Sequence, residues 1–293
     1  MISIVQSQEI EELLCRISGL SNNDGNPRLK LILHDFVKAI MQLIEKHDIS
    51  ENEFWGSIDF LDKSGPELGL IVPGIGLEHF MDLYLDARAA EAGRTGGTPR
   101  TIEGPLYVAG APLEKGEAKL TDDAEDGDTL HMSGSIYGPN SQPVKDAILH
   151  VWHADTKGNY SHFDPSQSPF NNRRRLKVGS DGRYSFTSTI PSGYSIPAGG
   201  TTDQLMTALG RHGKRPAHVH FFVEASGLAN LTTQINIADD PFLHDDFAFA
   251  TRDGLVPVIN RSGSEARIEF DFHLLLAMSS DDMEFSKRPR VGA

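Results

Sequence analysis

Two histidines and two tyrosines are the side chains of this sequence best suited to bind a metal ion. His218 and His220 form the motif HVH, Tyr160 follows a Gly-Asn pair, and Tyr194 follows Pro-Ser-Gly. The alternating apolar pattern of residues 218–223 predicts a strand, and a strand places side chains i and i+2 on one face. Both histidines can therefore reach one metal ion.

The chemistry of these four donors narrows the choice of metal. Imidazole suits zinc, copper, iron and nickel, whereas an anionic phenolate is a hard donor that favours a highly charged cation. A tyrosine has an ordinary pKa of about 10, so at neutral pH it binds as phenolate only where a cation stabilises the anion. The set predicts Fe(III). Taken singly, the HVH pair and each tyrosine are also explained as ordinary parts of a sheet, so the prediction rests on their combination.

Length, charge and cysteine content limit the class of protein. The chain has 293 residues, a formal net charge of −14 and one cysteine, Cys15. It can build one large or two smaller domains, and it cannot form an internal disulfide. Nucleic-acid binding needs clustered Lys and Arg, and the only dense basic run, residues 173–175, is predicted to be a solvated strand edge, so no nucleic-acid partner is expected. Without a signal-peptide pattern in residues 1–12 or a run of about 20 apolar residues, a cytoplasmic protein outside the membrane is expected.

Hydrophobic periodicity changes at about residue 95. Before it, apolar residues recur three and four apart, and Ser50 has the context of a helix N-cap, so helices are predicted over residues 10–17, 29–46 and 77–92. After a glycine-rich link at residues 93–99, short alternating runs predict strands over residues 130–137, 147–152, 183–188 and 268–275.

The strands are expected to close into a β-sandwich. Ser180-Asp181-Gly182 is a hairpin signal in which glycine supplies a positive φ. The predicted fold is α+β, with a helical linker or dimerisation domain at residues 1–95 followed by an antiparallel β-sandwich catalytic domain at residues 96–293 that carries the Fe(III) site. The polar tail, residues 279–293, is expected to contribute little to chemistry.

Four longer motifs carry a resemblance to a known family. They are TPRTIEGPLYVAGAP at residues 98–112, VWHAD at 151–155, GRHGKRP at 210–216 and DDFAFATRDGL at 245–255. With the four ligand candidates, they resemble the intradiol ring-cleaving dioxygenases, closest to the bacterial catechol 1,2-dioxygenases. The resemblance spans nearly the whole chain.

The resemblance implies roles for individual residues. Tyr160, Tyr194, His218 and His220 would bind a non-haem Fe(III) with hydroxide as a fifth ligand, and Tyr194 and His220 would be axial. Arg215 would stabilise charge on the bound ring and Gln234 would lie beside the substrate. The pocket would be shaped by Leu70, Pro73, Ile102, Phe247 and Ala248.

Charge counting is consistent with this site. Fe(III), two phenolates and one hydroxide sum to zero, and neutrality survives binding of a catechol dianion only if hydroxide and one tyrosinate leave with the two catechol protons. Tyr194 is the candidate for the departing ligand and base. Arg215 is a fixed cation that favours developing negative charge on the ring. The family chemistry implies that catechol and O2 give cis,cis-muconate, as in the degradation of aromatic compounds.

The resemblance also frames the substrate and the partners. Leu70, Pro73 and Ile102 offer no partner for a third ring hydroxyl, which favours catechol over hydroxyquinol, whereas chlorocatechols and alkylcatechols are rejected only by size. Relatives are homodimers joined through N-terminal helices, in some cases with a phospholipid in an apolar tunnel. A homodimer is therefore expected, and a bound phospholipid is the further possibility.

Two other classes of protein remain as alternatives. A β-sandwich binding module stabilised by zinc would prefer Cys and His in a closed site, and here the single cysteine is far from the histidines in sequence. An extradiol dioxygenase with Fe(II) needs two histidines and a carboxylate but no tyrosine. The acidic cluster His244-Asp245-Asp246 is interpreted as ordering a loop near the pocket and is left outside the predicted site.

Overall fold

The computed structural model describes residues 3–288 and residue 290. Contacts divide the chain into two compact units, Met1–Gly65 and Pro66–Ala293. This division falls earlier in the chain than the change of periodicity at residue 95, because the helices after residue 65 pack within the second unit. Over the described residues, no single helix has the length and apolar character to cross a bilayer, and only the bent pair Gly65–Gly74 and Leu77–Glu91 passes that test jointly.

The first unit is helical. It contains a short 3-10 helix and three α-helices, which are η1 (Ile4–Gln6), α1 (Gln8–Ser18), α2 (Pro27–His47) and α3 (Glu51–Lys63). Ser50 Oγ accepts a hydrogen bond from the Glu53 amide while the Glu53 carboxylate accepts one from the Ser50 amide, which completes a capping box. The helices predicted over residues 10–17 and 29–46 and the cap at Ser50 are confirmed.

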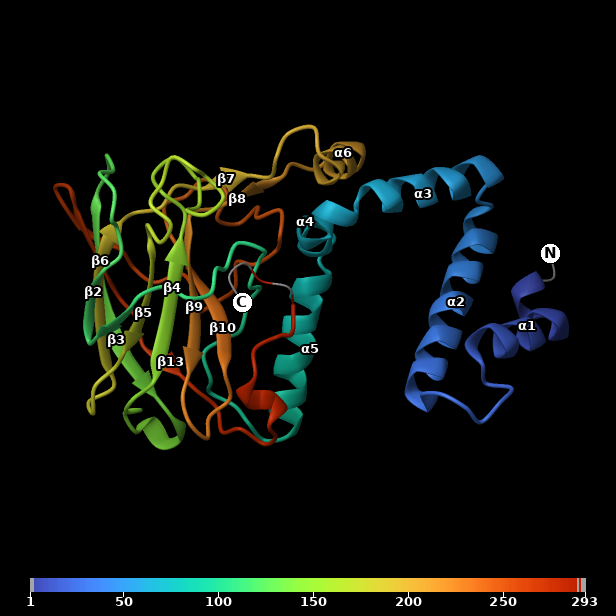
Figure 1. The fold of residues 1–293 in the computed structure, drawn as a ribbon, viewed down its shortest axis with the longest axis horizontal. Coiled ribbons are helices and arrows are strands. Elements are labelled where there is room, and N and C mark those ends of the chain that lie inside the picture. The colour runs from blue at the N-terminus through green and yellow to red at the C-terminus, as the bar shows by residue number, and fades with distance from the viewer. Residues whose placement is uncertain (1–2, 289, 291–293) are drawn as a thin grey trace. The chain divides into compact units, whose positions relative to one another are not determined.

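The second unit combines helices with two facing sheets. Its helices are η2 (Gly65–Glu67), α4 (Leu68–Gly74), α5 (Leu77–Glu91), η3 (Pro139–Ser141), α6 (Thr201–Ala208) and η4 (Asp281–Met283). Its strands are β1 (Leu113–Lys115), β2 (Glu117–Lys119), β3 (Thr129–Tyr137), β4 (Ile148–His153), β5 (Arg173–Lys177), β6 (Arg183–Thr189), β7 (Tyr194–Ser195), β8 (Lys214–Arg215), β9 (His218–Glu224), β10 (Leu231–Asn236), β11 (Asn260–Ser262), β12 (Glu265–Glu269) and β13 (Phe272–His273). Figure 1 shows α4 and α6 near the end of the sandwich where β7 and β8 lie.

The two sheets form the expected α+β sandwich, but they are mixed and not purely antiparallel. One sheet has the order β1-β5-β4-β9-β10 and the other β11-β12-β3-β6-β2, while β7 and β8 form a small ribbon. The pairs β1–β5, β2–β6, β3–β12 and β3–β13 are parallel. The prediction of an antiparallel sandwich was wrong in this respect, because long connections bring these strands back alongside their partners.

Two strand predictions need correction. The turn at Gly182 has the expected positive φ of 69°, but it joins β5 in one sheet to β6 in the other and is not a hairpin. The run predicted over residues 268–275 is broken into β12 and β13. The break lies where the Phe270 carbonyl approaches Gly134 so closely that a Cβ at Gly134 would be 1.7 Å from the Phe270 oxygen.

Strand β9 is buried on both of its faces. Val219, Phe221 and Val223 belong to the core between the two sheets, whereas His218 and His220 point to the opposite face. That outer face is covered as well, so every residue of the strand except Glu224 at its end is buried. The prediction that both histidines share one face is confirmed.

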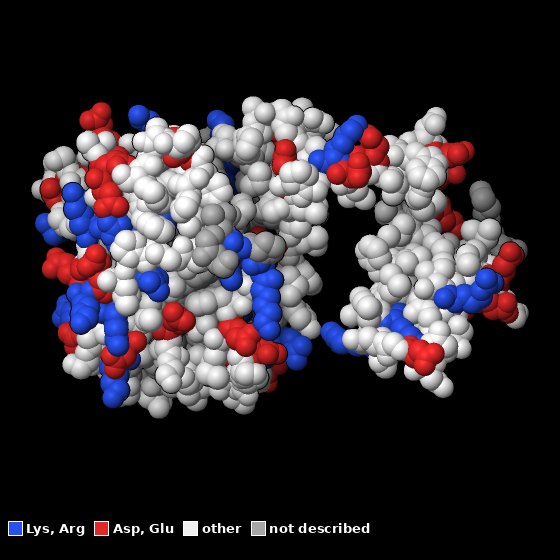
Figure 2. Space-filling view, in the orientation of Figure 1, with Lys and Arg blue, Asp and Glu red and all other residues white. Residues whose placement is uncertain are grey.

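The basic run at residues 173–175 is not a solvated edge. Arg173 is 1% exposed, and it donates to Ser161 Oγ at 2.8 Å and to the Leu106 carbonyl at 2.8 Å. Arg174 is also buried and pairs with Asp122. The prediction failed because β5 lies between β1 and β4. On the face drawn in Figure 2, the visible basic and acidic side chains of the second unit are intermixed.

Candidate metal centre and substrate pocket

The two histidines are fixed by the centre of one sheet. In the ladder on either side of β9, His220 lies opposite Trp152 of β4 and Gln234 of β10, and His218 lies opposite Asn236. The Nε2 atoms of His218 and His220 are 2.9 Å apart. His218 Nδ1 donates to the Pro216 carbonyl at 2.7 Å, which leaves the lone pair of its Nε2 atom facing the site.

Tyr194 and Arg215 are positioned by a second, smaller ribbon. They are directly opposed residues of β7 and β8. The Arg215 Nη1 atom lies 3.4 Å from Tyr194 Oη and 3.1 Å from His218 Nε2. The ribbon therefore brings a phenol and a cation to the edge of the histidine pair.

Tyr160 follows a turn that Asp155 organises. The Asp155 carboxylate accepts the amides of Lys157 and Asn159, each at 2.8 Å, and Gly158 has a φ of 86°. The ring centroids of Tyr160 and Tyr194 are 5.5 Å apart, and those of Tyr194 and His218 are 5.7 Å apart. The structure thus gathers all four predicted ligands in one place.

The electrostatics of these groups suit a cation. Burial, followed by the charge of Arg215, lowers the pKa of His218 to about 3, and burial holds the pKa of His220 well below its ordinary value. Both imidazoles are therefore neutral and able to donate a lone pair. Burial raises the pKa of Tyr160 well above 10, so this phenol ionises at neutral pH only beside a strong positive charge.

An orphaned atom supports the fit of a metal to this donor set. Tyr160 is 4% exposed, and its Oη atom is buried without a hydrogen-bond partner among residues 3–288 and 290. A buried hydroxyl without a partner costs roughly 1 to 3 kcal/mol. A metal ion held by Tyr160, Tyr194, His218 and His220 would supply the missing partner.

Arg215 is held by a buried network. Its Nε and Nη2 atoms contact the Asp246 carboxylate at 3.2 and 3.1 Å, and its Nη2 atom donates to Gln234 Oε1 at 2.9 Å. Burial lowers the pKa of Arg215, but the charge of Asp246, the hydrogen bond to Asp246 and the two neighbouring tyrosines together raise it above its ordinary value. Burial raises the pKa of Asp246, and Arg215 more than reverses that effect. Arg215 and Asp246 therefore form an ionised pair.

A cavity of about 330 Å³ opens over the tyrosines. Tyr160, Tyr194 and Arg215 line it, whereas His218, His220 and Gln234 lie beneath its surface. All five predicted pocket residues are on its walls, namely Leu70, Pro73, Ile102, Phe247 and Ala248. The cavity is open to apolar ring-shaped molecules and has a cation at its base.

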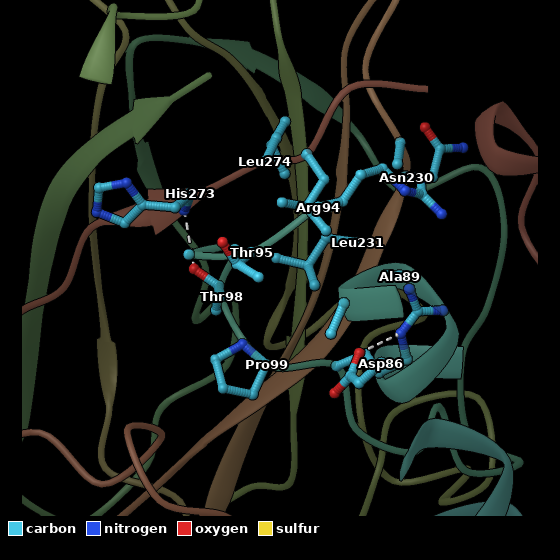
Figure 3. Close-up of a pocket in the computed structure, with 16 residues that line it drawn as sticks. Asp86, Ala89, Arg94, Thr95, Thr98, Pro99, Asn230, Leu231, His273 and Leu274 are labelled. Atoms are coloured by element: carbon cyan, nitrogen blue, oxygen red, sulfur yellow. Dashed lines mark hydrogen bonds and ion pairs between the residues drawn. The ribbon is translucent and has the colours of Figure 1, made fainter. Parts of the chain in front are cut away.

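A second cavity, of about 260 Å³, lies away from this site. Figure 3 shows it between α5, the glycine-rich link and the segment around His273. Its charged groups are already paired, since Arg100 contacts Asp86 and Arg94 contacts Asp282. None of the four predicted ligands lines it, so we assign the chemistry to the cavity over the tyrosines.

Some residues of the site were missed from sequence. Asp246 does order a loop as interpreted, since it accepts the Ala248 and Ala250 amides, but it also pairs with Arg215. Its place in the DDFAFATRDGL motif beside Phe247 was the available signal. Trp152 stacks on His220 with ring centroids 4.8 Å apart and an interplanar angle of 5°. Further wall residues are Gly69, Pro105, Leu106, Ile196 and Pro197.

Comparison with known proteins identifies the family. The family model described as "Dioxygenase" matches residues 102–277, and the model described as "Catechol dioxygenase N terminus" matches residues 26–93. The chain belongs to the intradiol dioxygenase family.

Individual relatives agree with this assignment. The chain is 51% identical over 260 residues to catechol 1,2-dioxygenase 2 of Acinetobacter lwoffii, covering 88% of this chain and 94% of that one. The crystal structure of catechol 1,2-dioxygenase from Pseudomonas arvilla C-1 superimposes with a TM-score of 0.92 at 44% identity, over 99% of both chains. The chlorocatechol 1,2-dioxygenase of Rhodococcus opacus is more distant, at 32% identity over 85% of this chain and 98% of that one.

Proposed function

We propose that this protein cleaves catechol with O2 between its two hydroxyl-bearing carbons and releases cis,cis-muconate, in the degradation of aromatic compounds. The observation that carries the proposal is the convergence of two phenols, one buried and one half-buried, and two neutral imidazoles at an apolar cavity. The similarity to catechol 1,2-dioxygenases supports the choice of substrate.

We infer that Tyr160, Tyr194, His218 and His220 hold Fe(III). Two phenolates and one hydroxide balance the three positive charges, so the resting centre is neutral and can be buried. When bound, ferric iron draws electron density from a chelated catechol and makes a ring carbon reactive toward O2.

Tyr194 is our candidate for the proton acceptor. It lines the cavity while Tyr160 lies deeper, at 4% exposure. A catechol that chelates a metal through both oxygens must lose two protons, and Tyr194 Oη, on the cavity wall, would accept one of them. Tyr194→Phe should keep the fold but lose at least about 100-fold in kcat, and undiminished turnover in a stopped assay would exclude this role.

Arg215 would stabilise the negative charge that develops on the ring. Its charge is fixed, because it is paired with Asp246 and is never deprotonated near neutral pH. Gln234 accepts from the same guanidinium and so fixes its plane. A preorganised cation in a buried site needs no rearrangement during the reaction.

The walls of the cavity favour catechol over hydroxyquinol. Leu70, Pro73 and Ile102 give no partner for a third hydroxyl, and a buried unpaired hydroxyl costs roughly 1 to 3 kcal/mol. Small apolar substituents meet no such penalty, so we expect measurable turnover of methylcatechols and chlorocatechols. A chlorocatechol dioxygenase is the second candidate, favoured by the apolar walls and weakened by the lower identity to that relative.

The visible spectrum of the purified protein tests the proposal. Phenolate bound to Fe(III) gives a red protein, and the band should shift when catechol is added without oxygen. Admission of air should then produce the ultraviolet absorbance of muconate. A colourless protein that holds zinc and leaves catechol intact would favour a binding module, and a yellow semialdehyde would show extradiol cleavage.

We further propose that the protein is a cytoplasmic homodimer joined through its N-terminal helices. One face of helix α2 exposes large apolar side chains three and four residues apart, with Leu29 at 58%, Ile32 at 51% and Phe36 at 61% exposure. Such a stripe favours burial against a second copy or against lipid chains, and a bound phospholipid fits the same stripe. Sedimentation analysis of the mass, followed by mass spectrometry of an organic extract, tests both parts.

A further inference from the structure

The wall of the substrate cavity that carries Leu70 and Pro73 is a short helix. Helix α4 has seven residues, and isolated helices shorter than about 12 residues are marginal in water. Its position must therefore come from contacts with the rest of the second unit. Two charged side chains outside the cavity lining make such contacts, one at each end of α4.

We propose that Glu67 and Arg211 are positioning residues that fix α4 over the cavity and thereby set how strongly the protein prefers catechol to ring-substituted catechols. This inference rests on the proposed function. Neither residue lines the cavity, so neither can act by touching the substrate.

Glu67 ties the start of α4 to helix α6. It immediately precedes α4, and its carboxylate accepts the Thr201 amide at 3.1 Å, the Thr202 amide at 2.8 Å and the Thr202 hydroxyl at 2.7 Å. These amides belong to the first turn of α6. A Cβ at Gly200 would lie 2.2 Å from Glu67 Oε1, so glycine there is what allows the close approach.

Arg211 ties the end of α4 to the opposite wall. Its Nη1 atom donates to the carbonyl of Gly74, the last residue of α4, at 2.6 Å, and its Nη2 atom donates to the Phe247 carbonyl at 2.9 Å. The guanidinium carbon also lies 4.6 Å from the ring centroid of Phe249. One side chain therefore joins the helix that carries Leu70 to the loop that carries Phe247.

The end of α4 and the ring of Phe247 are so close that α4 cannot move further toward the opposite wall. A Cβ added at Gly74 would lie 3.0 Å from Phe247 Cε2. Leu70 and Pro73 face the cavity on one side of this contact, and Phe247 and Ala248 face it on the other. If the Arg211 tie is removed, α4 can only move outward, which widens the cavity.

The test compares Arg211→Met and Glu67→Gln with the control Arg261→Met in the full-length, iron-loaded protein. Arg261 also makes two charged contacts, to Asp128 and Asp239, but lies outside the cavity. Each variant is assayed with catechol and 4-methylcatechol. Amide hydrogen exchange of residues 68–74 is measured without substrate, and catechol affinity is measured by titration under argon.

We expect both test variants to speed exchange in residues 68–74 and to weaken catechol binding about 10-fold, with less than about a threefold change in kcat, because uniform binding is lost and not transition-state stabilisation. The ratio of kcat/KM for 4-methylcatechol to that for catechol should rise about fivefold, within the range for one methyl group. The control should change each quantity by less than about twofold. If Arg211→Met does not fold, Arg211→Lys, which retains one donor, should show the same shifts at a smaller size.

Unchanged exchange and an unchanged ratio in both test variants would overturn the inference. A fall in kcat at constant affinity would also overturn it, since that pattern belongs to a group acting in the chemical step. Failure of the proposed function is separate, because the unmodified protein would then neither bind nor cleave either catechol, while hydrogen exchange would still report whether the two ties hold α4.

Discussion

The predicted metal ligands and the walls of the cavity are held in place by different means. His218 and His220 lie on β9, which is bonded to β4 on one side and β10 on the other. The walls are α4 and the loop at residues 246–250, which depend on single side chains such as Asp246 and Arg211. The positions of the two histidines are supported by many backbone hydrogen bonds, whereas each wall depends on a few contacts.

This difference means that the reaction and the choice of substrate depend on parts of the molecule that are supported differently. A substitution near the histidines can move them only if it disrupts the backbone hydrogen bonds between β9 and its neighbouring strands. A single substitution can remove the contact that holds a wall of the cavity in place. The histidine pair should therefore tolerate changes of neighbouring residues, and the preference among catechols should change easily. Four substitutions test this comparison.

Tyr160→Phe should have the largest effect on activity. The ring stays in place, and Oη has no hydrogen-bond partner among the described residues, so the free energy of unfolding of the metal-free protein should rise by about 1 to 3 kcal/mol. A direct ligand is lost, and since even residues behind metal ligands are worth 10- to 100-fold, activity should fall more than about 100-fold. Visible spectroscopy, metal analysis and turnover measure this.

Tyr184→Phe is the matched control. Tyr184 is also buried, but its hydroxyl donates to the Phe270 carbonyl at 2.7 Å. It should lose about 1 kcal/mol of stability and keep its activity. If Tyr160→Phe kept the colour and the turnover, Tyr160 would not be a ligand.

Gly158→Ala should strongly destabilise the turn before Tyr160. The residue has a φ of 86°, and an added Cβ would lie 2.9 Å from Tyr194 Cβ and 2.9 Å from the Gly193 carbonyl. We expect a loss of about 3 kcal/mol in unfolding free energy, which combines backbone strain with the clash. Gly199→Ala, at a φ of 77° with open space around it, should lose only about 1 kcal/mol. Equal losses in urea denaturation would mean that the packing of the two tyrosines is not tight.

Asp246→Asn should lower kcat/KM by about 10- to 100-fold with the metal retained. The side-chain carbonyl of the new asparagine can still accept a hydrogen bond from one backbone N–H of the loop, but Arg215 loses the negative charge with which it pairs. Asp245→Asn, at a neighbouring but exposed carboxylate, should change kcat/KM by less than twofold. A normal kcat/KM for Asp246→Asn with an unchanged red band would show that Arg215 needs no partner.

Asp82→Asn should have the smallest effect on activity, because it should change stability alone. Burial, followed by the charge of Glu78, raises the pKa of Asp82 from 3.8 to about 7. The folded state then holds the proton more tightly than the unfolded state, so stability is lost as pH rises from about 4 to 7. Asparagine removes this loss and should stabilise the protein by up to about 4 kcal/mol at pH 8, with no gain below pH 4.

Exposed Asp253→Asn is the control for that measurement. Thermal unfolding at pH 4, 6 and 8 should show a gain that grows with pH for Asp82→Asn and no such trend for Asp253→Asn. A gain in stability of the same size at pH 4, 6 and 8 would mean that the effect does not come from protonation of Asp82.

The sequence predicted which residues gather around the cavity better than it predicted the sheets. Alternation around His218 and His220 is local, so it specified their common face, and the family resemblance implied Leu70 and Phe247 as pocket residues. The failures were non-local. A glycine turn such as that at Gly182 has the same φ whether the next strand joins the same sheet or the other one.

Burial of charge was the second non-local failure. Arg173 is buried where it donates to the Leu106 carbonyl, and Arg174 is buried where it pairs with Asp122, and both contacts join residues far apart in the chain. The partnership of Arg215 with Asp246 likewise spans 31 residues. Complementary charges in a sequence show that an ion pair is possible, but only the fold shows which charged side chains lie in contact.

The stacking of Trp152 on His220 gives the molecule an internal optical reporter. The sequence has two tryptophans, and the other, Trp55, is 59% exposed in the first unit. Emission from an exposed indole lies at longer wavelength than emission from a buried one, so the two signals separate. Trp152 stacks directly on the predicted ligand His220. Its short-wavelength emission should therefore decrease when that imidazole binds a ferric ion, and the fluorescence intensity would report the fraction of the protein that holds iron.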